Sequence, residues 1–324
     1  MPKNMTKKSK KSTYKIRNWS EYNESLKQRG NLTVWISQNV VQDWFHHGPK
    51  QRGAQKVYSD LSIETGLTLR MVFQLGLRQT EGFLASVIKL MELPVTAPNY
   101  STLCRRQSQL TIKRPSRTNA EPVHLVVDST GVKVYGEGEW KVRQHGVSKR
   151  RTWRKLCLAV DENSGEILAS TLTANAADDG SQVNPLLDQI KEPICAFGGD
   201  GGYDKRKVYD ALKDRAETQC QELTIIIPPQ ENAKIWQHGN CETLPHPRDE
   251  NLRYIRKHGR KKWKKDKNYH SRSLSETAMF RYKTIFGNNL RTRKLENQIV
   301  ETNIGCAALN RMTQLGMPDS YKVA

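Results

Sequence analysis

The spacing of apolar residues divides the chain into a helical first third and a second part of mixed structure. Between residues 31 and 110, apolar side chains recur at three- and four-residue steps, which is typical of helices that bury one face. The segment 79–93 shows this most clearly, with Phe83, Leu84, Val87, Ile88, Leu90 and Met91. Prolines in LPVTAPNYST end that helix, and polar residues at 111–121 predict a linker after one further short helix.

After the linker, short apolar runs predict five strands, at residues 123–127, 153–160, 166–171, 194–197 and 223–227. The turn DENSG joins the second strand to the third. Helices are expected over residues 181–190 and from Asp204, whose side chain would cap the second of them. Three meandering strands, followed by helices that alternate with two more strands, match the order of ribonuclease H. The predicted fold class is therefore α/β: a ribonuclease-H-like mixed five-stranded sheet with helices, preceded by an all-α N-terminal module.

The charge of the chain indicates what it binds. Lys and Arg number 53 against 33 Asp and Glu, a formal net charge of +20. A chain this basic favours a polyanion, because contacts to phosphate release counterions; nucleic acid is the default partner and an anionic membrane surface the weaker one. No apolar run approaches the roughly 20 residues that cross a bilayer. The six cysteines are scattered without a CxxC motif, which is typical of reduced thiols in a cytoplasmic protein.

Charge and periodicity together predict four regions: a basic arm (1–30), a helical DNA-binding module (31–110), a ribonuclease-H-like core (120–228 with 269–324) and a basic insertion (229–268). The arm is expected to stay disordered until it meets DNA. In the module, the short helix after LPVTAPNYST carries Arg105 and Arg106. It is either the recognition helix of a helix-turn-helix or the solvated end of a helical bundle.

The end of the insertion is densely basic. Nine Lys or Arg residues lie between Arg256 and Arg272, with Trp263 and Tyr269 among them. A solvated, charged helix face is one interpretation of this pattern. The density of cations beside aromatic rings favours a surface that contacts phosphates and bases, including Lys261, Lys262, Trp263 and Lys264.

The segment 269–283 concentrates polar chemistry on one side of a predicted helix. At about 100° per residue, four side chains fall within a sector of roughly 60°: Tyr269, Arg272, Glu276 and Lys283. Leu274, Ala278 and Ile285 lie opposite them as an apolar stripe, while Phe280 lies near the polar side. A lone carboxylate among cations suits a metal ligand beside phosphates. An ordinary i,i+4 ion pair between Arg272 and Glu276 is the structural alternative.

Two aspartates are candidates for the same metal site as Glu276. Asp128 ends the first predicted strand as VVDSTG, and Asp200 follows the fourth as FGGDGGYD. These strands are neighbours in the ribonuclease-H-like order, so both carboxylates would meet at one edge of the sheet. Clustered carboxylates suit hard divalent cations, which neutralise their mutual repulsion. Asp128 before Ser129 could instead form a turn. The glycines around Asp200 do not indicate a nucleotide-binding loop, because no Gly-Lys-Ser/Thr follows.

The spacing Y-x2-R-x3-E-x6-K at Tyr269, Arg272, Glu276 and Lys283 resembles the signature of bacterial insertion-sequence transposases of the DDE type. DSTGVKVYGEGEW, RTWRKLCLAVD and GDGGYDK resemble the first two acidic blocks of that family, and RNWSEYNESLKQRGNLTVW resembles the N-terminus of its IS-five-like branch. The resemblance covers nearly the whole chain.

This resemblance implies a catalytic, metal-binding triad of Asp128, Asp200 and Glu276 with two Mg²⁺ or Mn²⁺ ions. Tyr269, Arg272 and Lys283 would contact the transposon end near the cleaved phosphate. It also implies that the N-terminal module binds terminal inverted repeats, that the protein works as a homodimer or higher synaptic complex on double-stranded DNA, and that it is associated with the nucleoid. In related enzymes an aromatic side chain of the insertion captures a flipped base, a role open to Trp263 or Trp236.

The predicted activity is DNA transposition in two steps. Hydrolysis at the end of the element exposes a 3′-hydroxyl, and the same site then directs that hydroxyl onto a phosphate of the target DNA. Two alternatives remain at this stage. One is a domesticated DDE nuclease that cuts without strand transfer, and the other is a non-enzymatic, sequence-specific DNA-binding repressor.

Overall fold

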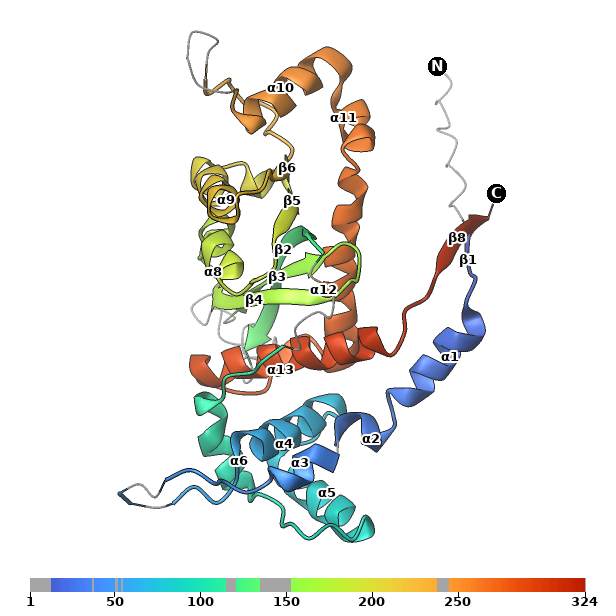
Figure 1. Cartoon of the computed structure of the whole chain (residues 1–324), viewed down its shortest axis with the longest axis vertical. Coiled ribbons are helices and arrows are strands. Elements are labelled where there is room, and N and C mark those ends of the chain that lie inside the picture. Colours follow the sequence, from blue (N-terminus) through green and yellow to red (C-terminus); the bar gives the residue numbers. More distant parts are fainter. Residues whose placement is uncertain are drawn as a thin grey trace, which may run out of the picture.

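The structure, a computed structural model, describes residues 13–36, 38–49, 52–53, 55–114, 121–134, 153–237 and 245–323. Figure 1 shows helices of the N-terminal module at one end of the long axis, a sheet flanked by helices in the middle, and two helices at the other end, α10 (Pro247–His258) and α11 (Arg260–Asp266). None of the helices in the described ranges combines the length and the apolar character needed to cross a membrane.

The central sheet has the strand order β4-β3-β2-β5-β6, and a further short strand, β7, pairs with β2. The strands are β2 (Val123–Val134), β3 (Trp153–Asp161), β4 (Ile167–Ala174), β5 (Ile194–Gly198), β6 (Thr224–Ile226) and β7 (Asn289–Leu290). β2, β3 and β4 form an antiparallel meander, whereas β5 runs parallel to β2 and β6 runs parallel to β5. This confirms the ribonuclease-H-like order. β7 was not predicted, because a strand of two residues is too short to show a periodic pattern in the sequence.

Alternate residues of the strands supply two separate cores. In β3, Leu156 and Leu158 belong to one apolar cluster, and Cys157 and Ala159 belong to the other. This two-residue period follows from the pleat of a strand. α8 (Val183–Leu187) and α9 (Arg206–Gln219) cover the second face, while α12 (Ser273–Phe286) and α13 (Leu295–Gln314) cover the first (Figure 1). The predicted helix 181–190 is shorter than expected, because its first turn is a 3-10 turn, η2 (Asp179–Gln182).

The N-terminal module shares its core with the sheet. Its elements are α1 (Trp19–Gln28), α2 (Leu32–Trp35), α3 (Gln38–Gln42), α4 (Asp60–Val72), α5 (Leu77–Leu90), α6 (Tyr100–Arg106) and η1 (Gln107–Gln109). α13 runs between the module and the sheet (Figure 1), and one continuous apolar cluster contains side chains from all three. α5 ends before the predicted residue 93, because Glu92 adopts a left-handed backbone with φ of 51°.

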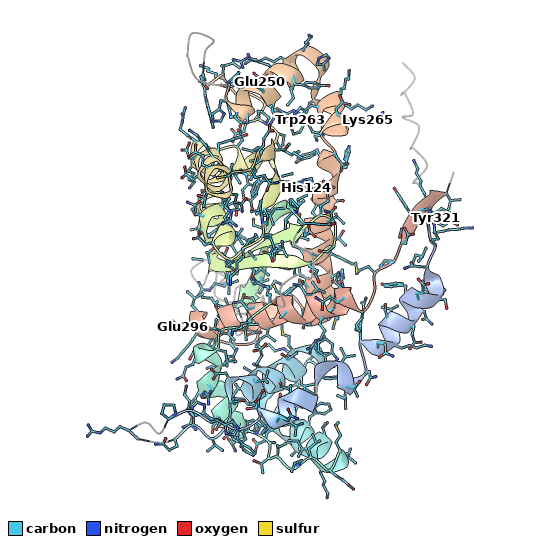
Figure 2. The ribbon with its side chains drawn as sticks, in the orientation of Figure 1. His124, Glu250, Trp263, Lys265, Glu296 and Tyr321 are labelled. Atoms are coloured by element: carbon cyan, nitrogen blue, oxygen red, sulfur yellow. The ribbon has the colours of Figure 1, made fainter. Side chains whose placement is uncertain are left out.

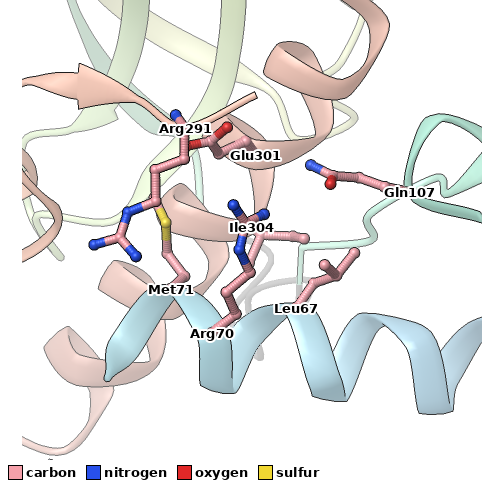
Figure 3. Close-up of a pocket in the computed structure, with 7 residues that line it drawn as sticks. All are labelled: Leu67, Arg70, Met71, Gln107, Arg291, Glu301 and Ile304. Carbon is pink, nitrogen blue, oxygen red and sulfur yellow. The ribbon is translucent and has the colours of Figure 1, made fainter. Parts of the chain in front are cut away.

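α4 and α13 meet around a small cavity, shown in close-up in Figure 3. Its volume is about 10 Å³, room for about one water molecule. Glu301 of α13 lies at this interface and accepts hydrogen bonds from the backbone N–H groups of Arg291 and Thr292, at 2.7 and 3.0 Å. The carboxylate of Glu301 thus holds the segment between β7 and α13 against α13 itself. The cavity is lined by Leu67, Arg70, Met71, Gln107, Arg291, Glu301 and Ile304.

The two ends of the described chain pair with each other. β1 (Thr13–Ile16) is antiparallel to β8 (Ser320–Val323), and together they form a separate two-stranded sheet. The prediction of a disordered arm over residues 1–30 is therefore wrong from residue 13 onward, where a strand and α1 follow in succession. The local sequence gave no sign of this strand, because its partner comes from the opposite end of the chain. Residues 1–12 lie outside the described part.

The structure describes residues 111–114 of the predicted linker 111–121, and Arg114 anchors this part to the rest of the protein. The guanidinium of Arg114 donates hydrogen bonds to the carbonyl of Leu168, at 3.0 Å, and to the side chains of Gln189 and Asn303, both at 3.1 Å. These partners belong to β4, to the segment after α8 and to α13. Residues 115–120 lie outside the described ranges.

Replacing Gly305 by alanine should destabilise the fold, although alanine favours helices. A Cβ atom at Gly305 would lie 2.6 Å from Cε2 of Tyr282 and 2.9 Å from Cε of Met71, and the Tyr282 ring is itself buried. We expect Gly305→Ala to lower the free energy of unfolding by about 1–3 kcal/mol, the usual cost of overpacking a core, as measured by urea denaturation.

Gly82→Ala is the matched control. Gly82 lies within α5, and nothing lies within 4 Å of its Cβ position. The same substitution there should raise the free energy of unfolding by up to about 1 kcal/mol through helix propensity. Equal effects of the two variants would contradict the close approach of α4, α12 and α13 at Gly305.

Candidate active site

The register of the parallel strands places Asp128 beside Asp200. Val126 of β2 is paired with Gly198 of β5, and each aspartate lies two residues further along its own chain. β2 continues past Asp128 to Val134, so the prediction that Asp128 ends this strand is wrong. Its pairing with β5 does end before Asp128, and this opens the sheet between the two carboxylates. The Asp200 carboxylate accepts a hydrogen bond from the N–H of Gly202 at 2.8 Å, which fixes the turn η3 (Gly201–Tyr203).

Glu276 reaches the same place from α12. The predicted continuous helix over residues 269–283 begins instead as a 3-10 turn, η4 (Tyr269–Arg272), and becomes α-helical at Ser273. The buried stripe of α12 is Ser275, Ala278, Met279, Tyr282 and Phe286. Of the predicted apolar stripe, Ala278 is buried, and Leu274 and Ile285 lie at the margins. Phe280 is 69% exposed, as its position near the polar side predicted.

Arg272 joins two of the three carboxylates. Its guanidinium donates to Oδ2 of Asp128 at 3.1 Å and to Oε1 of Glu276 at 2.5 Å. The i,i+4 pair that the sequence offered as a structural alternative is therefore present, and it extends across to the sheet. Lys283, about two turns after Glu276 on the same helix, donates from Nζ to Oγ1 of Thr130 on β2 at 2.5 Å. The polar side of α12 thus faces the strand that carries Asp128.

Burial and the charges of neighbouring carboxylates set the electrostatics of the site. Burial raises the pKa of Asp128, and the charges of Asp200 and Glu276 raise it further, against the lowering effect of Ser129 N–H and Arg272. Burial also raises the pKa of Tyr269, whose ring lies 5.8 Å from the Arg272 guanidinium carbon. These influences show that the three carboxylates and Tyr269 share one electrostatic environment. A cation placed there would be strongly stabilised.

The donor set of this site fits a hard divalent cation. It consists of carboxylate oxygens, without a thiolate or imidazole, which is the chemistry that Mg²⁺ and Mn²⁺ prefer. Among the described residues, however, no three His, Cys, Asp or Glu side chains are close enough together to hold a metal ion. The guanidinium of Arg272 supplies the positive charge between Asp128 and Glu276. Metal binding would therefore require that Arg272 release at least one of these carboxylates.

Asp204 has a role that the sequence did not indicate. It was predicted to cap α9, but the residue that precedes this helix is Lys205. The Asp204 carboxylate is instead buried and accepts hydrogen bonds from Nε and a terminal nitrogen of Arg248, at 2.6 and 3.2 Å. Arg248 lies in α10 and stacks at 3.9 Å on the Trp236 ring. This ion pair fastens the insertion to the loop that carries Asp200.

Trp263 is not available to DNA bases in this structure. Its side chain is 0% exposed, it donates from Nε1 to Oδ1 of Asn251 at 3.0 Å, and it packs against Tyr269. The prediction of a base-contacting Trp263 is therefore wrong, because the indole anchors α11 to Asn251 of α10 and to Tyr269 of η4 (Figure 2 labels Trp263). Lys261 and Lys262 are exposed on α11, and Nζ of Lys264 lies 5.3 Å from the centre of the Tyr269 ring.

Arg105 and Arg106, predicted together as DNA contacts, have different environments. Arg106 is only 8% exposed; it forms an ion pair with Asp60 and donates to the carbonyl of Tyr58 at 2.9 Å. It is a structural residue, which corrects that prediction. Arg105 is exposed and lines an open groove of about 550 Å³ with Arg78, which stacks on Tyr100 at 4.5 Å.

A second polar cluster supports η4, the turn that leads into α12. His124 of β2 pairs with Glu162, which also accepts a hydrogen bond from the side chain of Asn268 at 3.0 Å (Figure 2 labels His124). Asn268 directly precedes η4 and has a left-handed backbone, with φ of 49°. The turn that aims Tyr269 and Arg272 toward the sheet is thus held by β2 itself. Sequence spacing could not reveal this cluster, since its members come from three distant segments.

Two family models, both described as Transposase DDE domain, match this chain, one over residues 27–137 and the other over residues 119–311. The second match alone covers more than half of the chain and includes Asp128, Asp200 and Glu276.

Among solved structures, the piggyBac transposase synaptic complex with hairpin DNA is 9% identical, with a TM-score of 0.42, over 93% of this chain and 76% of that chain. The Drosophila P element transposase strand transfer complex is 12% identical, with a TM-score of 0.30, over 63% of this chain and 48% of that chain. These TM-scores are too low to identify a shared fold, and the fold is identified by its strand order instead.

The buried pair of Asp204 and Arg248 should be essential to stability. Arg248→Met would leave the Asp204 carboxylate buried without its cation, and we expect a loss of about 3–5 kcal/mol in the free energy of unfolding, measured by urea denaturation. The double variant Asp204→Asn with Arg248→Met should recover part of this loss, because it removes the uncompensated charge. A double variant less stable than Arg248→Met alone would contradict this explanation.

Proposed function

This chain belongs to the DDE transposase family, and on that premise we propose that it cleaves DNA at the ends of a transposable element and joins them to target DNA. Membership makes it a DNA transposase, a polynucleotidyl transferase that depends on divalent metal ions. The observation that carries the proposal for this chain is the strand register, which aligns Asp128 with Asp200 while Arg272 links Asp128 to Glu276.

Asp128, Asp200 and Glu276 are the proposed metal ligands and catalytic residues. Two Mg²⁺ or Mn²⁺ ions held there would activate the attacking water or 3′-hydroxyl and stabilise the leaving oxygen. The three carboxylates sit on a strand, a turn fixed by its own hydrogen bond and a helix packed on the core. Rigid elements of this kind hold ligands in place better than loops do. The Asp128 side chain is 16% exposed and the Glu276 side chain is 53% exposed, so Glu276 is the more accessible of these two to DNA.

Tyr269, Arg272 and Lys283 are the proposed contacts to the transposon end. They project from the same side of η4 and α12 as Glu276, so a phosphate close to that carboxylate lies within their reach. A phosphate would draw Arg272 away from Asp128 and Glu276, because it offers the guanidinium a bidentate partner. DNA binding would in this way expose the carboxylates to metal.

Two further surfaces suit the duplex that leads into this site. Lys261 and Lys262 are exposed on α11, next to the catalytic helix, and Lys264 lies beside Tyr269. In the N-terminal module, Arg78 and Arg105 line the groove between α5 and α6, where they could hold the terminal inverted repeat. We propose a homodimer or higher assembly that brings two ends together, acting on DNA at the bacterial nucleoid.

Glu276→Gln should abolish cleavage and leave DNA binding intact. The amide keeps the size of the side chain but loses the anionic oxygen that a divalent cation requires. We expect cleavage of DNA carrying the element's own ends to fall by more than about 100-fold. Loss of a residue that only supports a metal ligand costs up to about 100-fold, and loss of the ligand itself should cost more. Glu217→Gln, on the exposed side of α9, is the control and should cleave as the wild type does.

The products of this assay separate the alternatives. Joined strands in the wild-type reaction establish transfer, whereas cut but unjoined ends indicate a nuclease. A wild-type protein that binds the ends and never cuts them, with Mg²⁺ or Mn²⁺, would overturn the catalytic assignment in favour of a repressor.

Arg272→Gln should raise the affinity of the DNA-free protein for Mn²⁺ while lowering cleavage. Without the guanidinium, residue 272 no longer competes with Mn²⁺ for Asp128 and Glu276. Removing a competition worth about 1.4 kcal/mol of binding free energy should raise the affinity for Mn²⁺ roughly tenfold. The affinity can be measured by electron paramagnetic resonance of unbound Mn²⁺. Arg253→Gln, whose wild-type partner is Glu250 in α10, is the control. Unchanged Mn²⁺ binding in Arg272→Gln would show that Arg272 does not compete with metal.

A further inference from the structure

The two-stranded sheet of β1 and β8 stands apart from the rest of the molecule. Figure 1 shows it at the outer end of α1, away from the central sheet and from α4, α5 and α6. We call this element, residues 13–16 with 320–323, the terminal ribbon. All of its residues whose burial the structure describes are exposed or half-buried, including Tyr14 at 63% and Tyr321 at 41%. Figure 2 shows Tyr321 on this ribbon, far from the sheet that carries His124.

The ribbon is nevertheless fixed to the chain at its base. The N–H of Arg17 donates to the carbonyl of Asp319 at 2.7 Å, and the N–H of Asp319 donates to Oδ1 of Asn18, also at 2.7 Å. The Arg17 guanidinium lies 5.6 Å from the centre of the Tyr321 ring. Both strands are thus held in one register where α1 begins, and the ribbon is presented to its surroundings as a unit.

Each face of the ribbon presents an aromatic ring and a cation. Directly paired residues of antiparallel strands share a face. Tyr14 is paired with Lys322, and Lys15 is paired with Tyr321. A sheet of two strands is marginally stable in water unless something covers it, so a ribbon with both faces open is a docking element without its partner.

The charge around the ribbon identifies the partner as a polyanion. The first 20 residues contain seven Lys or Arg, of which Lys15 and Arg17 lie at the ribbon, and no Asp or Glu. Lys322 adds a cation from the other strand, and Asp319 at the base is already paired with Arg17. A second copy of the chain is a poor occupant, because a twofold contact would place these like charges against one another.

We propose that the terminal ribbon docks into a groove of duplex DNA and so ties both ends of the chain to the substrate. The major groove of B-form DNA admits a two-stranded ribbon, with lysines reaching the phosphates on either side. This inference rests on the proposed function, since it presumes that DNA is the substrate. It adds a contact surface outside the catalytic helix, the basic insertion and the groove of the module.

Charge-neutralising substitutions on the ribbon test this assignment. We expect Lys15→Gln with Lys322→Gln to weaken the binding of a fluorescent duplex, measured by anisotropy without divalent metal. Two lost phosphate contacts should reduce the slope of log K against log salt by about 1.8, and the affinity at 0.1 M salt by at least about tenfold. Lys191→Gln with Lys213→Gln removes two exposed cations near α8 and α9, distant from the ribbon, and should change neither quantity. A ribbon variant that binds like this control would overturn the proposal.

Hydrogen–deuterium exchange of the full-length protein identifies the occupant directly. Amides of residues 14–16 and 321–323 should become protected when duplex DNA is added. Protection that instead follows protein concentration without DNA would assign the ribbon to a second copy and refute DNA docking. If the wild type cuts transposon ends while DNA leaves these amides unprotected, the ribbon assignment alone fails. If the wild type neither binds nor cuts duplex DNA, the proposed function fails as well.

Discussion

The parallel pairing of β2 with β5 is the constraint on which the candidate site depends. Because Val126 is paired with Gly198, two carboxylates more than 70 residues apart in sequence lie side by side where the pairing of β2 with β5 ends. The buried apolar residues on both faces of β2 and β3 hold this register, since a shift by one residue would turn every core side chain toward the opposite face. Glu276 then needs only a helix that packs on the same sheet.

Crowding three carboxylates creates an electrostatic cost that the protein offsets with a cation of its own. Arg272 lies between Asp128 and Glu276 and is held at the start of α12 by Tyr269 and by the contacts of Asn268. Similar logic operates at Asp204, where Arg248 neutralises a buried carboxylate and at the same time docks the insertion. Arg272 is 23% exposed, and in the proposed function DNA displaces it, whereas Arg248 is 5% exposed and stays buried with its partner.

α13 connects the sheet that carries the candidate site with the N-terminal module. It packs on β4 and α12 on one side and on α4 on the other, so the module and the sheet share one core instead of being joined by a loose linker. Arg114 strengthens this connection by binding β4 and α13. In the proposed function, a DNA end bound by the module would therefore lie at a fixed position relative to Asp128, Asp200 and Glu276. The terminal ribbon and α1 extend beyond this shared core (Figure 1).

The sequence by itself determined the strand order and the polar side of α12 and supplied the proposed triad, because these follow from local periodicity and from residue types at fixed spacing. Only the tertiary structure decided which polar side chains are exposed and which are buried against a partner. Arg106, Trp263 and Asp204 looked like surface or capping residues, yet each is buried against a partner from a distant segment. β1 was predicted to be disordered for the same reason, as its partner β8 lies at the other end of the chain. The local pattern of apolar residues shows which face of an element is buried. It does not show which distant residue packs against that face, because that contact depends on the packing of the whole fold.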